Sequence, residues 1–554
     1  AGPANVAVSV GPTLRTYRLA VAATGEYTAA RGGTVASALA AITTTVNRVV
    51  GVYEKELAVR LVLVANQTQI IFTNAAAATD PYTNNNPTAL LTQNQTTLTT
   101  RIGAANYDIG HVFSTAGGGV ASLRSVCVAA AKAQGETGTS NPVGDAFDID
   151  YVAHEMGHQL GGNHPFNGTQ LNCAGGNRNA ATAYEPGSGS TIMAYAGICG
   201  SDDLQPNSNA YFHSASFEEM TAYVALSGCG TTTTTGNAAP VVTVPANRTI
   251  PKGTPFELQA TATDANRDAL TYCWEELDLG PAGPPSPVRV ANQTPPLFRS
   301  LPPVTARSRF FPRLAELRLG TPIKGETLPT VARLLRFRCT VRDQHLGTAG
   351  VVGGVTTSPV VTLTVAATAG PFVVTAPNTT PVVWTIGQPA TITWSVANTY
   401  VAPVNCTAVR ILLSVNGGLS FTRTLAANVP NTGSATITVP AGVATTQARV
   451  MVQAIGNYFF DISNANFRIV TPPTAPRFAA TTEPLVGAAC QNRPMTYRVA
   501  VAPVLGFADS VHLSVSGLPP GATATFGRRA LVPPDTTWLR VTVGQTPAPP
   551  SRIR

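Results

Sequence analysis

The chain has 554 residues, of which 44% are hydrophobic and 12% are charged. That length predicts about three to five domains of ~100–200 residues each, because a single core rarely grows larger. The net charge of +8 comes almost wholly from arginines, which are scattered apart from a local cluster from Arg299 to Arg318. No basic run argues for nucleic acid, so we interpret the charge as a solvated surface and expect no nucleic acid partner. We also expect no membrane span, since no apolar run reaches the ~18–20 residues that a span needs.

The N-terminal part of the chain alternates strand and helix patterns. Residues 1–15 are interpreted as the remnant of a propeptide, and the alternation that follows them predicts a twisted, mostly parallel sheet with helices packed against it. In chain order, the expected elements are a strand at 16–23, a long amphipathic helix at 34–56, strands at 58–64 and 69–72, a helix over about 87–104, and a strand at 107–115 that leads into a run of glycines.

The segment HEMGHQLGGNH, which begins at His154, has the pattern of a metal-hydrolase site. His154 and His158 are four residues apart, so on a helix both imidazoles leave the same face one turn apart. Gly161 allows the chain to turn sharply where the helix ends, which brings His164 back as a third nitrogen ligand. Three protein ligands leave a fourth tetrahedral position open for water, and this predicts a catalytic Zn²⁺. Glu155 is placed to act as the general base on that water.

This HExxHxxGxxH arrangement resembles the metzincin zinc metallopeptidases. The second mark of that family is a methionine turn below the metal, and STIMAY supplies it here, with Met193 as the apolar floor. The whole segment 16–230 resembles the reprolysin-like, M12B-type branch as found in secreted bacterial proteins. The resemblance implies an α/β (α+β) metzincin domain, secreted or at a bacterial cell surface. It further implies a zinc-dependent metalloendopeptidase that hydrolyses protein or peptide substrates with a zinc-activated water and Glu155 as the base.

Tyr195, two residues past Met193, is a further catalytic candidate. Astacin- and serralysin-type metzincins carry a tyrosine at this spacing, where it can ligate zinc and swing away to stabilise the tetrahedral intermediate, whereas reprolysins usually have proline there. The other interpretation is a tyrosine packed in the wall of the substrate pocket, and the sequence does not decide between the two. Pappalysin-type metzincins share this tyrosine and are the nearest alternative family.

The substrate must lie extended across the cleft, and an edge strand can hold it by main-chain pairing. We expect this edge at Gly118, Gly119 and Val120, where glycines let a second backbone approach closely. A flexible loop would leave the same pattern, so both interpretations stay open.

Eight cysteines without a CxxC pair favour disulfides formed in an oxidising compartment. The metzincin resemblance implies that Cys127–Cys229 ties a central strand to the end of the domain and that Cys173–Cys199 clamps the lower half of the cleft. Free buried thiols are the alternative, because spacing alone does not fix connectivity. The remaining four are Cys273, Cys339, Cys406 and Cys490, and no partner is predicted for the last two.

Five consecutive threonines begin at Thr231, and we expect residues 231–239 to form a linker. Beyond it, short alternating strands and frequent Pro and Gly turns predict all-β Ig-like sandwich domains. Their expected ranges are 240–368, 371–471 and 474–554, the last being a partial sandwich with too few strands to close.

The segment TATDANRDALTYCWEE resembles a cadherin-like or polycystic-kidney-disease-type Ig sandwich. Cys273 and Cys339 lie in the middle of two of its strands, and a cross-strand disulfide is predicted. Loops of this kind often bind calcium, so the sequence permits a structural Ca²⁺, although Asn266 and Arg267 replace the expected acidic or glycine residues. Other acidic residues that could contribute are Asp145, Asp148, Asp150, Asp202, Asp203, Asp264 and Asp268; the first three are expected chiefly to favour the N-terminus of the active-site helix.

Every residue that the predicted chemistry needs precedes Thr231. We therefore expect the sandwiches to be dispensable for the cleavage of small peptides and to bind a surface or matrix ligand. The alternative function is a surface adhesin with an accessory or vestigial protease domain, because more than half of the chain is predicted to be sandwich.

Overall fold

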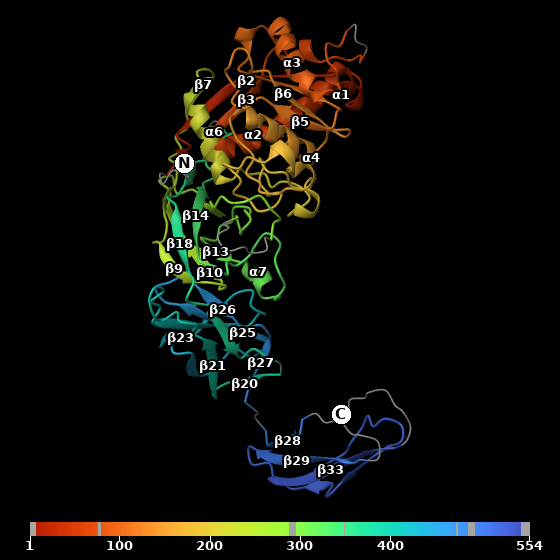
Figure 1. Ribbon diagram of the computed structural model, residues 1–554, viewed down its shortest axis with the longest axis vertical. Helices are drawn as coiled ribbons and strands as arrows, with labels where there is room; N and C mark the ends of the chain where they lie inside the picture. The colour runs from red at the N-terminus through yellow and green to blue at the C-terminus, as the bar shows by residue number, and fades with distance from the viewer. Residues whose placement is uncertain are drawn as a thin grey trace. The chain divides into compact units, whose positions relative to one another are not determined.

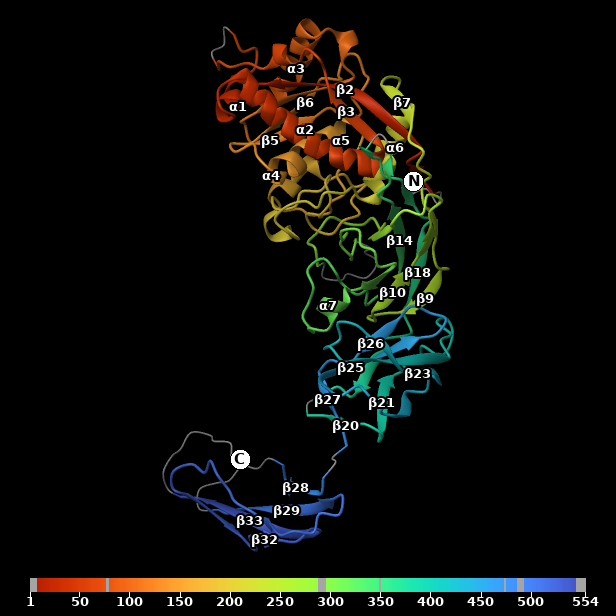
Figure 2. The ribbon, with the colours of Figure 1, turned by 180° about the vertical axis from the view of Figure 1, so that it is seen from behind.

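The computed structural model describes residues 7–75, 79–286, 295–347, 350–379, 381–472, 475–485 and 493–544. Two compact units are present, and each is described by itself: the first comprises Ala1–Val382, Pro389–Thr438 and Thr445–Arg468, and the second Val383–Gln388, Val439–Ala444 and Ile469–Arg554. Figure 1 and Figure 2 show the ribbon from opposite sides, coloured from red at the N-terminus to blue at the C-terminus.

A mixed sheet of strand order β3-β2-β4-β6-β5 forms the centre of the N-terminal domain (Figure 1). Strands β2, β3, β4 and β6 run parallel, whereas β5 pairs antiparallel with β6 and forms an edge. This arrangement matches the mostly parallel sheet that the sequence predicts. The strands are β2 (Thr13–Ala23), β3 (Val59–Leu63), β4 (Ile109–Ser114), β5 (Gly118–Ala121) and β6 (Gly135–Gly138).

Helices cover both faces of this sheet. Because successive strand residues point to opposite faces, Leu19 and Val21 enter the core beneath helix α2 (Val35–Leu57), whereas Ala20 enters a second core with α3 (Pro87–Arg101). The other helical segments of the domain are α1 (Gly25–Ala30), η2 (Ala104–Asn106), α4 (Asp145–Phe147), η3 (Asp148–Ala153), α5 (His154–Gln159), η4 (Leu171–Cys173), η5 (Gly175–Asn177), η6 (Gly200–Asp202) and α6 (Ser214–Leu226).

Helix α2 is long and apolar enough, by length and composition alone, to cross a membrane. Here its apolar face lies in the main core, where Ile42, Val49 and Tyr53 are fully buried. Thr34 begins the helix with a capping box, in which its side chain accepts from the backbone of Ser37 and the Ser37 hydroxyl accepts from the backbone of Thr34. We therefore describe α2 as a core helix of the N-terminal domain.

The strand predicted after β3 is not formed as such. The chain makes a 3₁₀ turn, η1 (Gln67–Ile70), followed by a single bridge between Ile71 and Ala23. Gln67 explains the difference, because its Oε1 accepts from the backbone N of Val21 at 3.1 Å and its Nε2 donates to the carbonyl of Val21. A side-chain amide thus occupies the place that a neighbouring strand would have taken.

The threonine run predicted as a linker is a strand. β7 (Thr231–Thr234) pairs antiparallel with the first residues of β2, with Thr13 opposite Thr234 (Figure 1). β-branched side chains suit a pleated surface, and this part of β2 extends beyond its pairing with β4 and therefore offers a free edge. The linker prediction is wrong for these residues.

Residues that we interpreted as a propeptide remnant also contribute a strand. β1 (Ser9–Val10) pairs antiparallel with β17 (Val355–Thr357) of the first sandwich, residues 240–368. The backbone N of Val8 also donates to the Thr357 hydroxyl at 3.1 Å. These residues are therefore built into the same unit as the N-terminal α/β domain and the first sandwich.

The first sandwich has one sheet of order β1-β17-β14-β18-β9, with β12 beside β14, and a smaller layer of β10 and β13. Aromatic residues fill the space between the layers, and Phe256, Phe298, Phe311 and Phe337 are in mutual ring contact. The elements are β8 (Val241–Thr243), β9 (Arg248–Pro251), β10 (Phe256–Gln259), β11 (Thr261–Thr263), β12 (Thr271–Glu276), β13 (Ser308–Phe311), α7 (Leu314–Leu317), β14 (Arg333–Arg342), β15 (Leu346–Gly347), β16 (Gly350–Val351) and β18 (Val361–Ala366).

The predicted Cys273–Cys339 disulfide is wrong, although both residues lie on the neighbouring strands β12 and β14. In the observed register Cys273 is opposite Thr340 and Cys339 is opposite Trp274, so the two thiols point to opposite faces of the sheet. Cys339 packs in the core and Cys273 donates to the carbonyl of Leu301 at 3.2 Å. Both cysteines are free and buried.

The second sandwich contributes two sheets to the first unit: β19-β21-β24, and β25-β22-β23 with β26 beside β25. Its strands are β19 (Val373–Ala376), β20 (Val383–Thr385), β21 (Pro389–Ser395), β22 (Ala408–Ser414), β23 (Arg423–Pro430), β24 (Ser434–Thr438), β25 (Thr445–Ala454), β26 (Phe460–Ile462) and β27 (Phe467–Val470). Cys406 is buried and free, whereas Cys490 lies outside the described residues.

The second unit contains a sheet of order β28-β29-β33-β31 and the short pair β30-β32. The chain as a whole therefore consists of an α/β N-terminal domain followed by β-sandwich modules, of which these strands form the last. The strands are β28 (Arg477–Glu483), β29 (Met495–Val504), β30 (Val511–His512), β31 (Ala522–Phe526), β32 (Ala530–Leu531) and β33 (Asp535–Val543).

Candidate active site

The active-site helix consists of α4, the π-helical turn η3 and α5, which follow one another without a break. It ends just before Gly161, whose φ of +103° is a left-handed conformation that glycine adopts without steric strain. A Cβ at this position would also approach the side chain of Tyr223 to 3.1 Å. The sharp turn reverses the chain and returns His164 to the helix, as the sequence pattern predicts.

Three imidazole nitrogens converge at one point. The Nε2 atom of His164 lies 3.1 Å from that of His154 and 2.9 Å from that of His158. Each ring is oriented by its other nitrogen: Nδ1 of His154 donates to the carbonyl of Ile192 at 2.7 Å and Nδ1 of His158 to that of Gly162 at 2.7 Å. The third donation, from Nδ1 of His164 to the carbonyl of Asn177, spans 2.5 Å.

These hydrogen bonds place the protons on Nδ1, so three Nε2 lone pairs face one another. Burial, reinforced by the neighbouring histidines, lowers the pKa of His154 well below its usual value and that of His164 to about 3. Burial also lowers the pKa of His158 to about 4, so all three rings are neutral near pH 7. Facing lone pairs repel unless a cation lies between them, and Zn–N distances of ~2.0–2.1 Å would place tetrahedral nitrogens about 3.3 Å apart. The donor set therefore fits a tetrahedral divalent metal.

The methionine turn lies directly beneath the helix. Met193 is fully buried, and a Cβ on Gly157 would come within 2.4 Å of its Sδ, so glycine is required where the helix crosses the turn. Glu185 fixes the turn from outside, because its carboxylate accepts from the hydroxyls of Ser190 at 3.1 Å and Thr191 at 2.8 Å. No sequence pattern marks Glu185, because it acts on residues that only the folded turn brings to it.

Glu155 lies beside the imidazole cluster in a nearly water-free position. Burial raises the pKa of its carboxyl well above the usual value, and the nearby Glu136 raises it further. Its Oε2 is buried and has no hydrogen-bond partner among the described residues. A Cβ on Gly119 would approach Oε1 of Glu155 to 2.6 Å, so this glycine makes room for the carboxylate.

Glu136 is a second buried acid that sequence analysis missed. It lies on β6, where Ser114 donates to its Oε1 at 2.6 Å, and burial raises its pKa to about 7. A strand of four residues is too short for the alternation of its side chains to predict that Glu136 points into the protein. Glu136 comes near Glu155 only in the folded domain, where β6 pairs with β4.

Tyr195 lies against the histidines. Its ring centroid is 4.6 Å from that of His164 and 5.5 Å from that of His154, and the ring stacks on Phe166 at 4.7 Å. Burial raises the pKa of the phenol above its usual value, so the hydroxyl stays protonated near neutral pH. The tyrosine therefore combines a packed ring with a position next to the metal ligands.

A cleft of about 650 Å³ opens in front of these residues. Its lining includes Gly117–Gly119, His154, Glu155 and Tyr195. The predicted substrate edge is a true edge strand, because β5 pairs only with β6 in the described sheet and its four residues are half-buried. Its pairing with a substrate remains a prediction.

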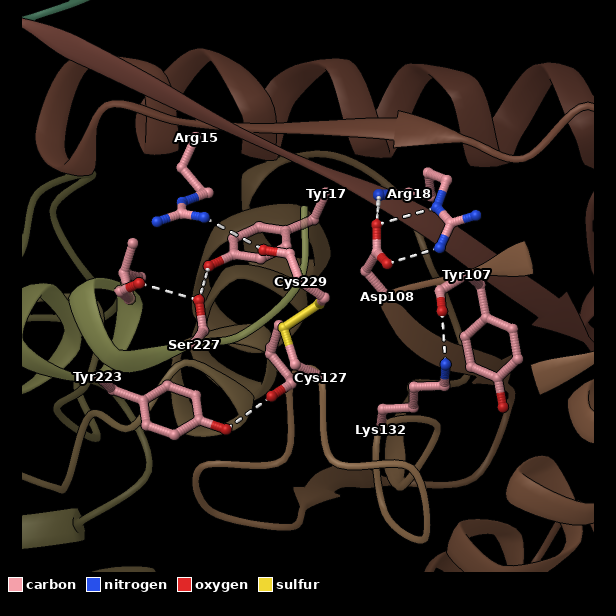
Figure 3. Close-up of a disulfide and its surroundings, with 12 residues drawn as sticks. Arg15, Tyr17, Arg18, Tyr107, Asp108, Cys127, Lys132, Tyr223, Ser227 and Cys229 are labelled. Atoms are coloured by element: carbon pink, nitrogen blue, oxygen red, sulfur yellow. Dashed lines mark hydrogen bonds and ion pairs between the residues drawn. A yellow bond between two sulfur atoms is a disulfide. The ribbon is translucent and has the colours of Figure 1, made fainter. Parts of the chain in front are cut away.

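Both disulfides predicted for this domain are present, Cys127–Cys229 and Cys173–Cys199. The first joins residues 102 positions apart, and Figure 3 shows it between the loop after β5 and the end of the domain. Tyr223 supports the same junction, because its hydroxyl lies 2.6 Å from the carbonyls of both Arg124 and Val126 and can donate its proton to either. The second disulfide joins η4 to the residues that follow the methionine turn.

Calcium finds no support in the peptidase domain. Asp202 accepts from the backbone of Thr169 at 2.7 Å and Asp203 from that of Cys199 at 2.9 Å, so protein donors already occupy these carboxylates. In the first sandwich, carboxylate oxygens of Asp264, Asp268 and Asp343 lie within 4.8 Å of one another. His345 contacts Asp268 at 2.8 Å, and Asp343 accepts from His345 and Gly354, so protein groups again satisfy two of the three acids.

Comparison with known proteins agrees with this geometry. Residues 13–222 match the family model described as "Metallo-peptidase family M12B Reprolysin-like". No curated protein matches the chain.

Several solved structures are similar to parts of the chain. The N-terminal four Ig domains of Dscam1 isoform 8.4 are 11% identical, with 42% of this chain and 47% of that chain covered and a TM-score of 0.12. Domains 1–6 of surface layer protein SbsC are 13% identical over 57% of this chain and 38% of that chain, with a TM-score of 0.14. The chain thus spans less than half of each, and likenesses this low carry no conclusion about it.

The family match covers the sheet, the three histidines, Glu155 and the methionine turn, and each has the geometry that the sequence pattern requires. The N-terminal domain of this chain is therefore a reprolysin-like metallopeptidase domain of family M12B.

Proposed function

We propose that the protein is a secreted zinc metalloendopeptidase. The observation that carries this proposal is the convergence of three Nε2 lone pairs whose rings are held by Nδ1 donation to backbone carbonyls. Metal-binding histidines are usually oriented in this way by a second hydrogen bond, which fixes the tautomer. The two disulfides support an oxidising compartment, and hence secretion.

His154, His158 and His164 would hold Zn²⁺, which when bound supplies Lewis-acid activation of water and of the scissile carbonyl. Glu155 takes the proton from the attacking water and passes it to the leaving amine. Its Oε2 is buried and has no hydrogen-bond partner among the described residues, so no protein group competes for the proton that it carries.

The substrate lies extended along β5 and adds a strand to the open edge of the sheet. Gly118 and Gly119 have no side chain to hold that strand away, and Val120 continues the edge. Tyr195 faces the same space, and its protonated hydroxyl donates a hydrogen bond to the oxyanion as the carbonyl becomes tetrahedral.

The alternative of an adhesin with a vestigial protease domain is favoured only by the length of the chain that the sandwich modules occupy, and the intact site argues against it. A decayed site would be expected to lose a ligand or the base, whereas all three histidines, Glu155 and Met193 have their required geometry. The family match also favours a reprolysin-like over a pappalysin-type peptidase.

The test combines metal analysis with peptide cleavage by the purified chain. We expect about one zinc per chain, internal cleavage of unstructured peptides, and loss of cleavage on chelation that added zinc reverses. Glu155→Gln should keep the zinc and lose about 10²- to 10⁴-fold in kcat/KM. Glu483→Gln, at an exposed residue of β28, is the control and should match the wild type. Zinc-loaded wild type that cuts no peptide would overturn the proposal.

A further inference from the structure

The cleft contains an acid that the proposed chemistry does not use. Asp150 belongs to the same continuous helix as His154, lies about one turn before it, and lines the cleft. Asn207 and Ser208 line the cleft beside it. The sequence suggested only that Asp150 favours the N-terminus of the helix.

The carboxylate of Asp150 has spare hydrogen-bonding capacity. The backbone N of Ser208 donates to Oδ1 at 2.8 Å, and the amide of Asn207, in the orientation that satisfies its neighbours, donates to Oδ2 at 2.8 Å. An ionised carboxylate offers about four acceptor sites, so roughly two stay open.

No positive charge accompanies this carboxylate. None of the residues that line the cleft is an arginine or lysine, and no ion pair to Asp150 exists within the part of the chain that the structure describes. Burial raises the pKa of Asp150 to about 6, with a small further increase from Asp145. An ionised but partly desolvated acid of this kind is stabilised by an incoming cation.

The direction of the substrate follows from the edge strand. Gly119 packs against the side chain of Glu155. The cleft is lined by Gly117–Gly119 but not by Val120. A substrate strand that pairs antiparallel with β5 therefore places the residues after its scissile bond towards Gly117. The side chain that enters the cleft is then the one immediately after the scissile bond.

We propose that Asp150 selects substrates with arginine or lysine immediately after the scissile bond. This inference rests on the proposed peptidase function and adds the substrate class. The long stem of either side chain spans the ~5 Å helical turn between His154 and Asp150. The cationic head then reaches the open acceptor sites of the Asp150 carboxylate. Arginine fits best, because its planar group can bond a carboxylate in two places.

The competing interpretation is that Asp150 only braces the wall at Asn207 and Ser208. Asp150→Asn separates the two roles, because it removes the charge and keeps an oxygen for the Ser208 backbone. The Asn207 side chain can rotate to present its oxygen to the new amide, so the wall stays braced. Asp145→Asn is the matched control: it removes an exposed acid at the start of the same helix, whose partner is Arg48 outside the cleft.

The experiment uses the full chain and peptides that differ only in the residue after the scissile bond: arginine, lysine, leucine or glutamate. For wild type and Asp145→Asn, we expect kcat/KM for arginine and lysine to exceed that for leucine by about 10- to 100-fold, as for a partly desolvated charge pair. Asp150→Asn should lose that preference while its kcat/KM for leucine stays within about threefold. Arginine amide should inhibit the wild type more strongly than Asp150→Asn.

Other outcomes would overturn the inference. Wild type that cuts leucine and arginine peptides equally would refute it and leave the peptidase function standing, and this holds even if Asp150→Asn does not fold. If Asp150→Asn lowered kcat/KM equally for every peptide, Asp150 would have only the structural role of holding Asn207 and Ser208 in place. A basic preference before the scissile bond would contradict the assigned direction. Zinc-loaded wild type without cleavage of any peptide would refute the peptidase function itself.

Discussion

Glu56 and Arg342 form a two-pronged ion pair in the interior of the first unit. The guanidinium Nε lies 2.7 Å from Oε1 of Glu56 and Nη2 lies 2.7 Å from Oε2, and both side chains are more than nine-tenths buried. Glu56 is at the end of α2 and Arg342 at the end of β14, so the pair joins the peptidase domain to the first sandwich. Phe212 completes it by donating its backbone N to Glu56 and accepting from Arg342.

Other contacts extend this junction to the active site. Ser300 of the sandwich accepts through its carbonyl from Ser190 of the methionine turn at 3.1 Å. Arg178, next to the residue whose carbonyl orients His164, donates to the carbonyl of Gly280 at 2.9 Å. Val355 of the sandwich is part of the main peptidase core. The sandwich therefore supports the turn and the segment that position His154 and His164.

Replacing Arg342 alone should destabilise the protein strongly. Arg342→Met leaves Glu56 buried without its cation, and we expect a loss of about 3–5 kcal/mol in the free energy of unfolding. Arg48→Ala, which breaks the exposed pair with Asp145, is the control and should change stability by less than about 1 kcal/mol. Urea unfolding measures both. The double variant Glu56→Leu with Arg342→Met should recover part of the loss, because no unpaired charge remains.

Truncation tests whether the sandwich is dispensable, as the sequence led us to expect. A fragment that ends at Gly230 lacks β7, Arg342 and Val355, so we now expect low solubility, a lower Tm and reduced cleavage of small peptides. A fragment that ends at Thr368 keeps all three and should match the full chain in solubility, Tm and peptide cleavage. Thermal unfolding and peptide assays on the two fragments decide the matter. A stable, fully active 1–230 fragment would restore the original expectation.

Gly119 should be essential for activity but not for metal binding. In Gly119→Ala the new Cβ would lie 2.6 Å from Oε1 of Glu155, so the carboxylate or the edge strand must move. We expect a loss of kcat/KM of about 100-fold, in line with misplacement of a catalytic group, and an unchanged zinc content. Gly117→Ala is the control, because nothing lies within 4 Å of a Cβ there. Equal activity of the two variants would contradict the tight fit.

Asp461, in the second sandwich, should make stability depend on pH. Burial raises its pKa to about 7 in the folded chain, although it accepts from the backbone of Val374 at 2.7 Å. The folded state therefore binds more protons than the unfolded state, in which the carboxyl titrates near its usual pKa of ~3.9. Its contribution is full below about pH 4 and is lost as the pH rises through about 7.

Asp461→Asn removes this titration and keeps an oxygen for Val374. We expect the variant to be more stable than the wild type at pH 8, by up to roughly 4 kcal/mol, with the difference vanishing towards pH 4. Urea unfolding at several pH values measures the difference between the two proteins, in which the other titrating groups cancel. A difference that does not vary with pH would show that Asp461 is ionised in the folded state.

The convergence of the three histidines could be predicted from the sequence because the pattern is local. His154 and His158 share a helix face through helical periodicity alone, and Gly161 returns His164 within three residues. Long hydrophobic and alternating patterns likewise predicted α2 and β2 to within a few residues. The pairs Cys127–Cys229 and Cys173–Cys199 were predicted through the resemblance to metzincins, whose topology brings these positions together.

Only the tertiary structure decided the features that depend on how segments distant in the sequence pair or pack. One residue of strand register puts Cys273 and Cys339 on opposite faces, and no local pattern contains that register. The threonine run became a strand because the distant β2 offered an unpaired edge. Asp150 faces the cleft only because residues after the methionine turn fold back beside the helix. Helices and strands follow from short-range periodicity, which the sequence shows directly. Strand pairing and buried charge contacts form only when segments distant in the sequence come together, so no local pattern predicts them.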